Sequence, residues 1–276
     1  MAEYLRPHHL EEALGALQRP LTVLAGGTDF YPARVGRSID EDILDIGAIA
    51  ALRGIARTAA GWRLGATTTW SEMIAADLPP LFDGLKQAAR EVGGRQIQNA
   101  GTIAGNLCNA SPAADGVPPL LALDAEVEIA SRAGARRVPL GTFITGNRRT
   151  VLMPGELVVA IHVPEPVHPA KIAFLKLGAR RYLVISIVMA AATLEIASGR
   201  VVSARVAVGA CSAVAQRLPA LEAAHAGAAL DAGLGGKVDP GHLAPLMPID
   251  DVRGSAGYRT DAALTVVRRL LQGFAP

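Results

Sequence analysis

The chain has 276 residues, half of them hydrophobic, so it is long enough to bury a large core as one or two domains. Its 27 Lys and Arg nearly balance 25 Asp and Glu, and no basic stripe suits a phosphate backbone, which argues against nucleic acid as a partner. Residues 1–10 lack the apolar segment of a signal peptide, and the apolar stretch 183–194 is too short to span a membrane, so we expect a cytoplasmic protein with no membrane span.

The first half of the chain is predicted to contain short helices and strands. Apolar residues recur at helical spacing over 9–17, and Pro20 ends that pattern. An apolar run at 21–25 stops at Gly26-Gly27, as expected for a buried strand that enters a glycine turn. With a strand at 42–46, it completes a small β-α-β unit. Beyond it the patterns predict helices from about residue 70 and over 81–92, and strands at 125–130, 137–140 and 157–163.

A proline-rich linker separates this half from the rest. Residues 164–169 hold three prolines in six positions, and the composition beyond them is richer in Ala and Val. There the stretch 183–194 is predicted to be buried strand and helix, and the helices are expected to cover one face of a sheet. The other predicted elements are strands at 172–177, 194–197 and 201–209 and helices at 218–230 and 261–272.

The two cysteines, Cys108 and Cys211, have no second thiol or His at metal-ligand spacing. We therefore predict no metal site and no cysteine-ligated iron–sulfur cluster in this chain. A disulfide between them stays open, although a reducing compartment argues against it.

Two glycine-rich segments are the candidate binding loops. The first, AGGTD at 25–29, follows a strand, and its two glycines let successive backbone N–H groups converge on an anion; a tight turn alone would also explain them. The second, at 92–106, is rich in small residues and amides and lacks the acid or base that proton transfer needs. It fits neither a P-loop nor the G-x-G-x-x-G pattern. We predict that both loops bind the phosphates of one dinucleotide, and we predict no catalytic residue.

The motifs AGGTD and GTIAGNLCNASPAAD (101–115), followed by VPPLLALDAEVEI, PGELVVAIHVP, KLGARR and DVRGSAGYR, resemble the FAD-binding subunit of molybdenum hydroxylases of the xanthine dehydrogenase and carbon monoxide dehydrogenase type. The resemblance covers nearly the whole chain. It implies an α+β fold: a two-lobed FAD-binding domain of the vanillyl-alcohol-oxidase (PCMH) type and a smaller C-terminal α+β domain. We place the first domain at 1–168, with lobes at about 1–55 and 56–168, and the second at 169–276.

The resemblance also implies a set of FAD-binding residues. Residues of the first loop would surround the pyrophosphate, Thr102, Gly105 and Asn106 would approach it from the second lobe, and Val92 and Gly93 would lie against the adenine. Cys108 and Asn109 would pass close to the flavin ring, Cys108 as a small apolar neighbour rather than a redox thiol. The first-loop residues in this set are Val23, Leu24, Ala25, Gly26, Gly27, Thr28, Asp29 and Phe30.

Three further residues are assigned to the cofactor by the same resemblance. Asp115 matches an acid that hydrogen-bonds FAD hydroxyls, and its alternative role is to cap a turn or helix after Pro112. Val158 matches an aliphatic residue beside the isoalloxazine. Lys176 matches a lysine near the carbonyl edge of the ring, where a cation would stabilise the reduced flavin; a solvated strand lysine is the alternative.

The function implied by the resemblance is electron transfer. A molybdopterin-binding subunit would hold the molybdenum cofactor, an iron–sulfur subunit would hold 2Fe-2S clusters, and FAD in this chain would pass electrons to an external acceptor. NAD is the expectation for that acceptor, with oxygen and quinone left open. Two alternatives are a self-contained flavin oxidoreductase of the same fold and a nucleotide-binding assembly subunit without redox turnover.

Overall fold

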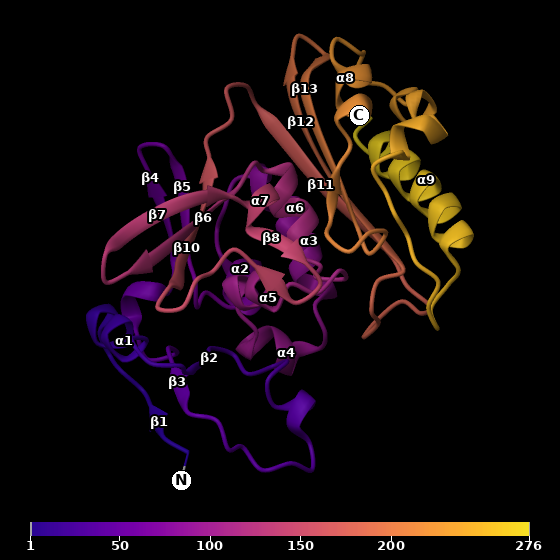
Figure 1. The fold of residues 1–276 in the computed structure, drawn as a ribbon. Coiled ribbons are helices and arrows are strands. Elements are labelled where there is room, and N and C mark those ends of the chain that lie inside the picture. The colour runs from indigo at the N-terminus through magenta and orange to yellow at the C-terminus, as the bar shows by residue number, and fades with distance from the viewer. Residues whose placement is uncertain (1, 276) are drawn as a thin grey trace.

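The computed structural model describes residues 2–275, which form three main sheets with a layer of helices between the two larger ones (Figure 1). At the N-terminus, β1 (Tyr4–Leu5), β3 (Ile43–Asp45) and β2 (Thr22–Leu24) make a parallel sheet in the order β1-β3-β2. Helix α1 (Leu10–Ala16) connects β1 to β2 and forms a β-α-β unit with them. The predicted unit differed, because it counted the strands at 21–25 and 42–46 and did not include β1. The connection from β2 to β3 contains only a short 3-10 helix, η1 (Pro32–Arg34), and a second one, η2 (Ala50–Leu52), follows β3.

The second sheet is antiparallel, in the order β4-β5-β10-β6-β7. Its central strand β10 is buried on both faces: Val158 and Ile161 join the main core, while Leu157 and Val159 pack with α1 and β3. The strands are β4 (Ile55–Thr58), β5 (Gly61–Gly65), β6 (Glu126–Ser131), β7 (Gly134–Pro139) and β10 (Leu157–Pro164).

The helical layer follows β5 and returns to the sheet at β6. Its buried centre holds Trp70, Phe82 and Phe143, all less than 2% exposed. The glycine-rich segment for which we predicted only loop structure forms two of its short helices, α4 and α5. The elements are α2 (Trp70–Ala75), η3 (Pro80–Phe82), α3 (Asp83–Glu91), α4 (Arg95–Ala100), α5 (Ile103–Asn109), α6 (Val117–Ala122) and, after β7, α7 (Leu140–Phe143) with the hairpin β8 (Ile144–Gly146) and β9 (Arg149–Thr150).

The C-terminal part is a four-stranded antiparallel sheet in the order β11-β12-β13-β14. Helices α8 and α9 of this part cover one face of the sheet, as predicted, and α3 and α6 of the first part cover the other face (Figure 1). The elements are β11 (Ala170–Leu177), β12 (Val188–Ala197), β13 (Arg200–Gly209), β14 (Gln216–Arg217), α8 (Pro219–His225), η4 (Leu234–Lys237), η5 (Pro240–Leu243) and α9 (Ala256–Gln272).

Strand β12 explains why this sheet is buried on both faces. Val188, Ala190 and Ala192 pack toward α8 and α9, whereas Met189 and Ala191 pack toward the helical layer of the first part. Because successive side chains of a strand point to opposite faces, the whole run is apolar and shows no alternation. The prediction of a helix within 183–194 was therefore wrong. The predicted helix at 218–230 also ends earlier, at the end of α8.

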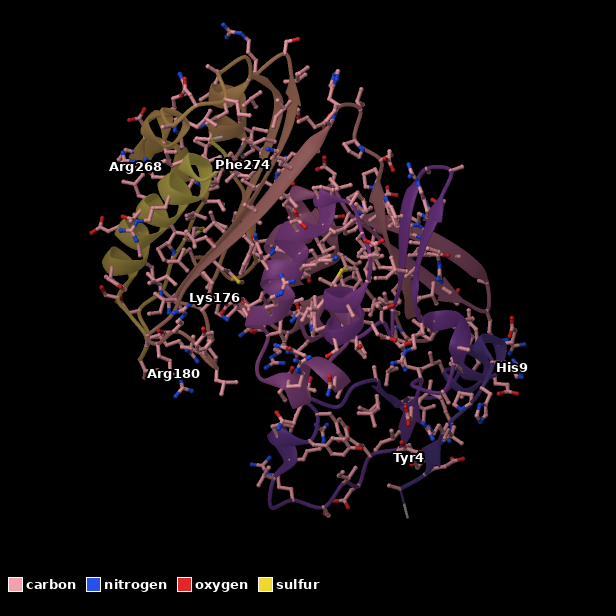
Figure 2. The ribbon with its side chains drawn as sticks, turned by 180° about the vertical axis from the view of Figure 1, so that it is seen from behind. Tyr4, His9, Lys176, Arg180, Arg268 and Phe274 are labelled. Carbon is pink, nitrogen blue, oxygen red and sulfur yellow. The ribbon has the colours of Figure 1, made fainter. Side chains whose placement is uncertain are left out.

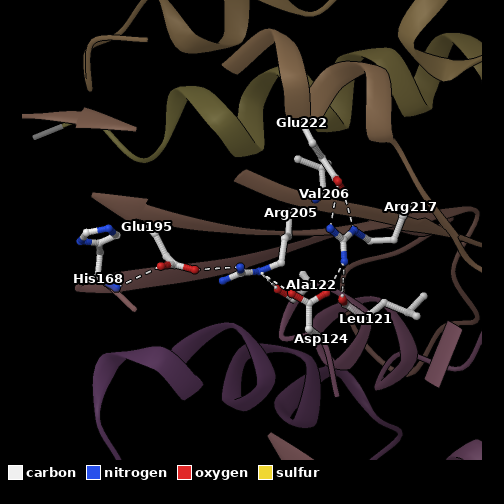
Figure 3. A network of polar contacts seen from close by, with 9 residues as sticks. All are labelled: Leu121, Ala122, Asp124, His168, Glu195, Arg205, Val206, Arg217 and Glu222. Carbon is white, nitrogen blue, oxygen red and sulfur yellow. Dashed lines mark hydrogen bonds and ion pairs between the residues drawn. The ribbon is translucent and has the colours of Figure 1, made fainter. Parts of the chain in front are cut away.

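A network of charged side chains joins the C-terminal sheet to the end of α6 (Figure 3). Arg205 donates to Glu195 at 2.8 Å and to the carbonyl of Ala122 at 3.0 Å. Arg217 donates to the carbonyl of Leu121 at 3.1 Å. The last carbonyls of a helix lack partners within it and attract cations, so these two arginines satisfy the end of α6 from the neighbouring sheet. Asp124 and Glu222 complete the network.

Replacing Glu195 with Gln should lower the free energy of unfolding by about 2 kcal/mol at neutral pH, because Arg205 loses its buried ionic partner. Burial opposes the ionisation of Glu195, but hydrogen bonds from Arg205 and from the N–H of His168 outweigh it and lower its pKa. The stabilisation is thus present above the unfolded pKa and is lost as the pH falls through the lower folded pKa. Urea unfolding of the parent and of Glu195→Gln between pH 3 and 7 measures this difference in the free energy of unfolding.

The matched control is Glu126→Gln, whose ion pair with Arg137 is 4.0 Å long and about half exposed. Exposed ion pairs contribute little to stability, so the free energy of unfolding of this variant should equal that of the parent. Equal losses in the two variants, or a Glu195→Gln loss that does not shrink in acid, would show that the network does not stabilise the contact with α6.

Candidate cofactor-binding site

A cavity of about 630 Å³ opens where the two glycine-rich loops, β10 and the β8–β9 hairpin converge. This volume is typical of a site for a cofactor or substrate. Residues from both predicted loops line it, together with Val92 and Val158. The predicted site residues that line the cavity are Val23, Leu24, Ala25, Gly26, Gly27, Thr28, Asp29, Phe30, Val92, Thr102, Gly105, Asn106, Cys108, Asn109 and Val158.

The first loop is pressed against the second by a close approach of backbones. A Cβ on Gly26 would lie 1.9 Å from the carbonyl oxygen of Ala100, so no residue larger than glycine fits there without displacing one of the loops. Gly27 has a φ of 69°, in the left-handed region that favours glycine. On the opposing side, a Cβ on Gly101 would meet the Thr28 hydroxyl oxygen at 3.4 Å. The sequence therefore brings two segments more than seventy residues apart into direct contact.

The first loop also presents a series of free backbone donors. Among residues 2–275, no acceptor is found for the N–H groups of Gly26, Gly27, Thr28, Asp29 and Phe30. Backbone N–H groups normally have a partner, and consecutive free ones form a concave site for an anion. Because these residues line the cavity, the groups are available to a bound phosphate.

The second loop offers side-chain donors instead. Several of its N–H groups already have acceptors within the protein. The N–H groups of Ile103 and Ala104 donate to the carbonyls of Thr68 and Ala66, respectively. The N–H of Gly105 donates to the Thr102 hydroxyl oxygen at 3.1 Å. The Thr102 hydroxyl keeps its proton for donation. Asn106 accepts from the N–H of Gly116 through Oδ1, which leaves its Nδ2 free within the described chain. The two loops thus present different kinds of donor to one cavity.

Arg34 and Arg148, which were not predicted as site residues, also line the cavity. Arg148 lies between β8 and β9 with a φ of 58°, donates to the side chain of Asn109, and approaches Asp29 at 3.8 Å. Arg34 stacks over the Phe30 ring with 3.8 Å between guanidinium carbon and centroid. No motif or spacing marks Arg148, because it lies in a short hairpin more than a hundred residues beyond Asp29.

Gly93, Asp115 and Lys176 are the predicted site residues that do not line this cavity. Lys176 Nζ donates to Asp115 Oδ2 at 2.8 Å, and Ser186 donates to Oδ1 of the same carboxylate at 2.7 Å. Burial raises the pKa of Asp115, while Lys176 and Ser186 act in the opposite direction. This buried group links the start of α6 to the end of β11. Gly93, with a φ of 53°, makes the turn between α3 and α4.

The Cys108 thiol faces the cavity, and Cys211 is buried elsewhere; both are free. Although Cys108 is exposed to the cavity, the protein packed around it raises its pKa to about 12 by desolvation. Even the ordinary thiol pKa lies above neutrality, so Cys108 is a neutral thiol at pH 7. Within residues 2–275, no group of His, Cys, Asp and Glu is arranged to hold a metal ion, and no helix is long and apolar enough to cross a membrane.

The cavity has the chemistry of a dinucleotide site. Free N–H groups suit a pyrophosphate, Thr102 and Asn106 can donate to it from the other side, and the aliphatic side chains of Val92 and Val158 suit flat rings. The two carboxylates that line it are both engaged by cations, Asp29 by Arg148 and Glu156 by Arg136. The hydrogen bonds from Arg136 hold the pKa of Glu156 below its ordinary value, so it stays ionised at neutral pH.

Comparison with known proteins agrees with this chemistry. Residues 1–166 match the family described as the FAD binding domain in molybdopterin dehydrogenase, and residues 173–274 match the CO dehydrogenase flavoprotein C-terminal domain. The chain is 30% identical to the xanthine dehydrogenase FAD-binding subunit of Escherichia coli O157:H7, over 98% of this chain and 94% of that one. It is also 30% identical to the carbon monoxide dehydrogenase medium chain of Afipia carboxidovorans, over 98% and 95%.

A solved structure extends the similarity to the whole fold. A chain of reconstituted CO dehydrogenase from Oligotropha carboxidovorans superposes with a TM-score of 0.90 and 28% sequence identity, covering 100% of this chain and 99% of that one. The free N–H groups beside a dinucleotide-sized cavity, the family matches over both parts of the chain and this superposition lead to one conclusion. The chain belongs to the family of FAD-binding subunits of molybdenum hydroxylases, the xanthine dehydrogenase and carbon monoxide dehydrogenase flavoproteins.

Proposed function

We propose that this chain carries FAD as an electron-transfer subunit, which takes electrons from the iron–sulfur clusters of a partner subunit and passes them to an external acceptor such as NAD. The observation that carries the proposal is the series of free N–H groups from Gly26 to Phe30 on the wall of the 630 Å³ cavity. FAD, when bound, supplies the redox chemistry. The chain's own residues bind the cofactor, orient it and shape its electrostatic surroundings.

The cavity favours electron transfer over a self-contained reaction on a substrate. No histidine from the described part of the chain lines it, its two carboxylates are paired, and Cys108 is a neutral thiol. General acid–base catalysis needs a group whose pKa lies near the working pH and whose proton can reach the substrate. Glu156, which Arg136 keeps ionised, and Cys108, which stays a neutral thiol, do not meet that requirement. Substrate chemistry is therefore proposed for a molybdopterin-binding partner subunit.

We assign the pyrophosphate of FAD to the first loop, between Gly26 and Phe30, with the Thr102 hydroxyl and the Asn106 amide opposite it. Val158 and Val92 would contact the rings. A pyrophosphate has oxygens on both sides, so two loops are needed to donate hydrogen bonds to it from both sides. The contact between Gly26 and Ala100 holds these two loops at a fixed separation.

The purified chain should therefore contain about one FAD per polypeptide. The measurement is the visible absorption spectrum, followed by chromatography of the cofactor released on denaturation. Photoreduction and reoxidation by an added acceptor then test turnover. FAD that cannot be reduced and reoxidised would indicate a nucleotide-binding assembly subunit, and oxidation of a small substrate by the chain alone would indicate a self-contained flavin oxidoreductase. A colourless protein that does not take up FAD would contradict the proposal.

Arg148 lines the cavity beside the first loop, and we expect its guanidinium to donate to a phosphate of the bound FAD. Replacing Arg148 with Ala should then weaken FAD binding by roughly 10- to 100-fold, the usual effect of losing one charge-assisted hydrogen bond. Without Arg148, the Asp29 carboxylate would also face the phosphates uncompensated. Fluorescence titration of the apoprotein with FAD measures the Kd. Arg149→Ala is the matched control, because Arg149 is the neighbouring arginine and does not line the cavity. Equal Kd values for the two variants would exclude Arg148 from the binding site.

Replacing Gly26 with Ala should abolish FAD retention, because the added methyl group overlaps the carbonyl of Ala100 and separates the loops. Gly15→Ala is the control: Gly15 lies in α1, nothing lies within 4 Å of its added Cβ, and alanine favours helix. Flavin absorbance and circular dichroism are measured together, so that loss of cofactor is distinguished from loss of fold. A folded Gly26→Ala protein with full flavin content would show that the loop contact does not determine binding.

A further inference from the structure

A second cavity, of about 290 Å³, lies at the end of β11 beside the first. The two are neighbours because Glu91 lines the second and the next residue, Val92, lines the first. The loop that follows β11 also lies close to the start of α4, because a Cβ on Gly94 would be 3.2 Å from the side chain of Leu183. Figure 2 shows Lys176 where the C-terminal sheet meets the first part, with Arg180 further along the same edge.

The lining of this second cavity is predominantly basic. Lys176, Arg180 and Arg181 line it, and Glu91 is its one carboxylate among the described residues. The Lys176 side chain is only 5% exposed, and its ammonium donates to Asp115 and to the carbonyl of Glu91 at 3.3 Å. An ammonium has three N–H donors, so one stays available to a ligand.

The two arginines are positioned by the loop that follows β11. Arg180 donates through Nε, at 3.1 Å, and through Nη2 to the carbonyl of Leu183, which folds this loop back on itself and leaves the Nη1 side of the guanidinium free. Arg181 lies over the Tyr182 ring, with 5.2 Å from the guanidinium carbon to the centroid. No carboxylate of the described chain is paired with either guanidinium. Both keep N–H groups free for the flat, two-oxygen groups that arginine binds best, namely phosphate and carboxylate.

We propose that this second cavity binds an anionic group, a phosphate or a carboxylate, of the electron acceptor. The inference rests on the proposed function and adds to it the chemical class of the acceptor. A volume less than half that of the first cavity suits one charged portion of a molecule whose reactive part reaches the first cavity. Reoxidation of one reduced FAD releases two electrons and two protons; a hydride acceptor takes two electrons and one proton, and the other proton goes to solvent.

Direct binding to the FAD-loaded full chain is the first test, because it does not depend on turnover and because FAD fills the other anion site. Inorganic pyrophosphate and succinate are titrated separately by calorimetry, so that phosphate and carboxylate preferences are distinguished. We expect one of them to bind, and Arg181→Ala to weaken it by roughly tenfold. Arg180→Lys, which keeps the positive charge but loses the paired N–H donors of the guanidinium, should weaken anion binding less than Arg180→Ala. Arg132→Ala, an exposed arginine in the β6–β7 turn, should bind like the parent.

Reoxidation of the photoreduced chain is the second test. Arg181→Ala should slow reoxidation by ferricyanide, an anion, several-fold relative to reoxidation by neutral benzoquinone, and added salt should reduce the difference. Binding of neither probe, equal effects in Arg132→Ala, or equal slowing with both acceptors would overturn the inference. Loss of FAD from Arg181→Ala would also overturn it, because the cavity would then be part of the cofactor site. A parent chain that takes up no FAD would instead contradict the proposed function.

Discussion

The candidate cofactor site depends on one close approach, the contact of the Gly26 backbone with the carbonyl of Ala100. It fixes the first loop on the second, although the two are far apart in sequence. With the loops in contact, no group of residues 2–275 accepts the N–H groups between Gly26 and Phe30. Unpaired backbone donors are unfavourable in a folded protein unless water or a ligand satisfies them. Here the cavity beside them offers room for such a ligand, so the same constraint that packs the loops also creates the binding surface.

The helical layer is what places this site next to the C-terminal part. Helices α3 and α6 pack against the four-stranded sheet, while α5 packs against β10 of the five-stranded sheet. One layer therefore serves two sheets, and the apolar faces of β12 leave it little freedom to shift. The charged network around Arg205 and Arg217 fixes the end of α6, and the Lys176–Asp115 pair fixes the segment before it. Both ends of a single short helix are thus held by the neighbouring sheet.

The sequence predicted those parts of the molecule that depend on local chemistry. The strand entering Gly26-Gly27 was predicted because a buried strand that ends in a glycine turn leaves a clear pattern, whereas the individual residues around the cavity were named from the resemblance of the motifs to a known family. The helices α4 and α5 were missed because glycines, amides and small residues mask helical periodicity over six or seven residues. Strand β12 was misinterpreted because burial on both faces removes the alternation that identifies a strand. Arg148 and the sharing of one sheet by two sets of helices depend on contacts distant in sequence, which no local pattern encodes.

Lys176 and Asp115 show that predicting which residues belong to a site does not predict how those residues are arranged relative to one another. Each was predicted to contact the cofactor separately, yet in this structure their charges are joined at 2.8 Å and buried. A buried charge without a partner is strongly destabilising. Either group can therefore contact a ligand only if the ion pair stays intact or the ligand supplies a new partner for the charge that is left. Lys176 can meet that condition without breaking the pair, because one N–H of its ammonium is unused. Asp115 lines neither of the two cavities, and both of its oxygens already accept hydrogen bonds, from Lys176 and from Ser186. The geometry therefore favours Lys176 as the member of the pair that contacts a ligand, with Asp115 holding it in place.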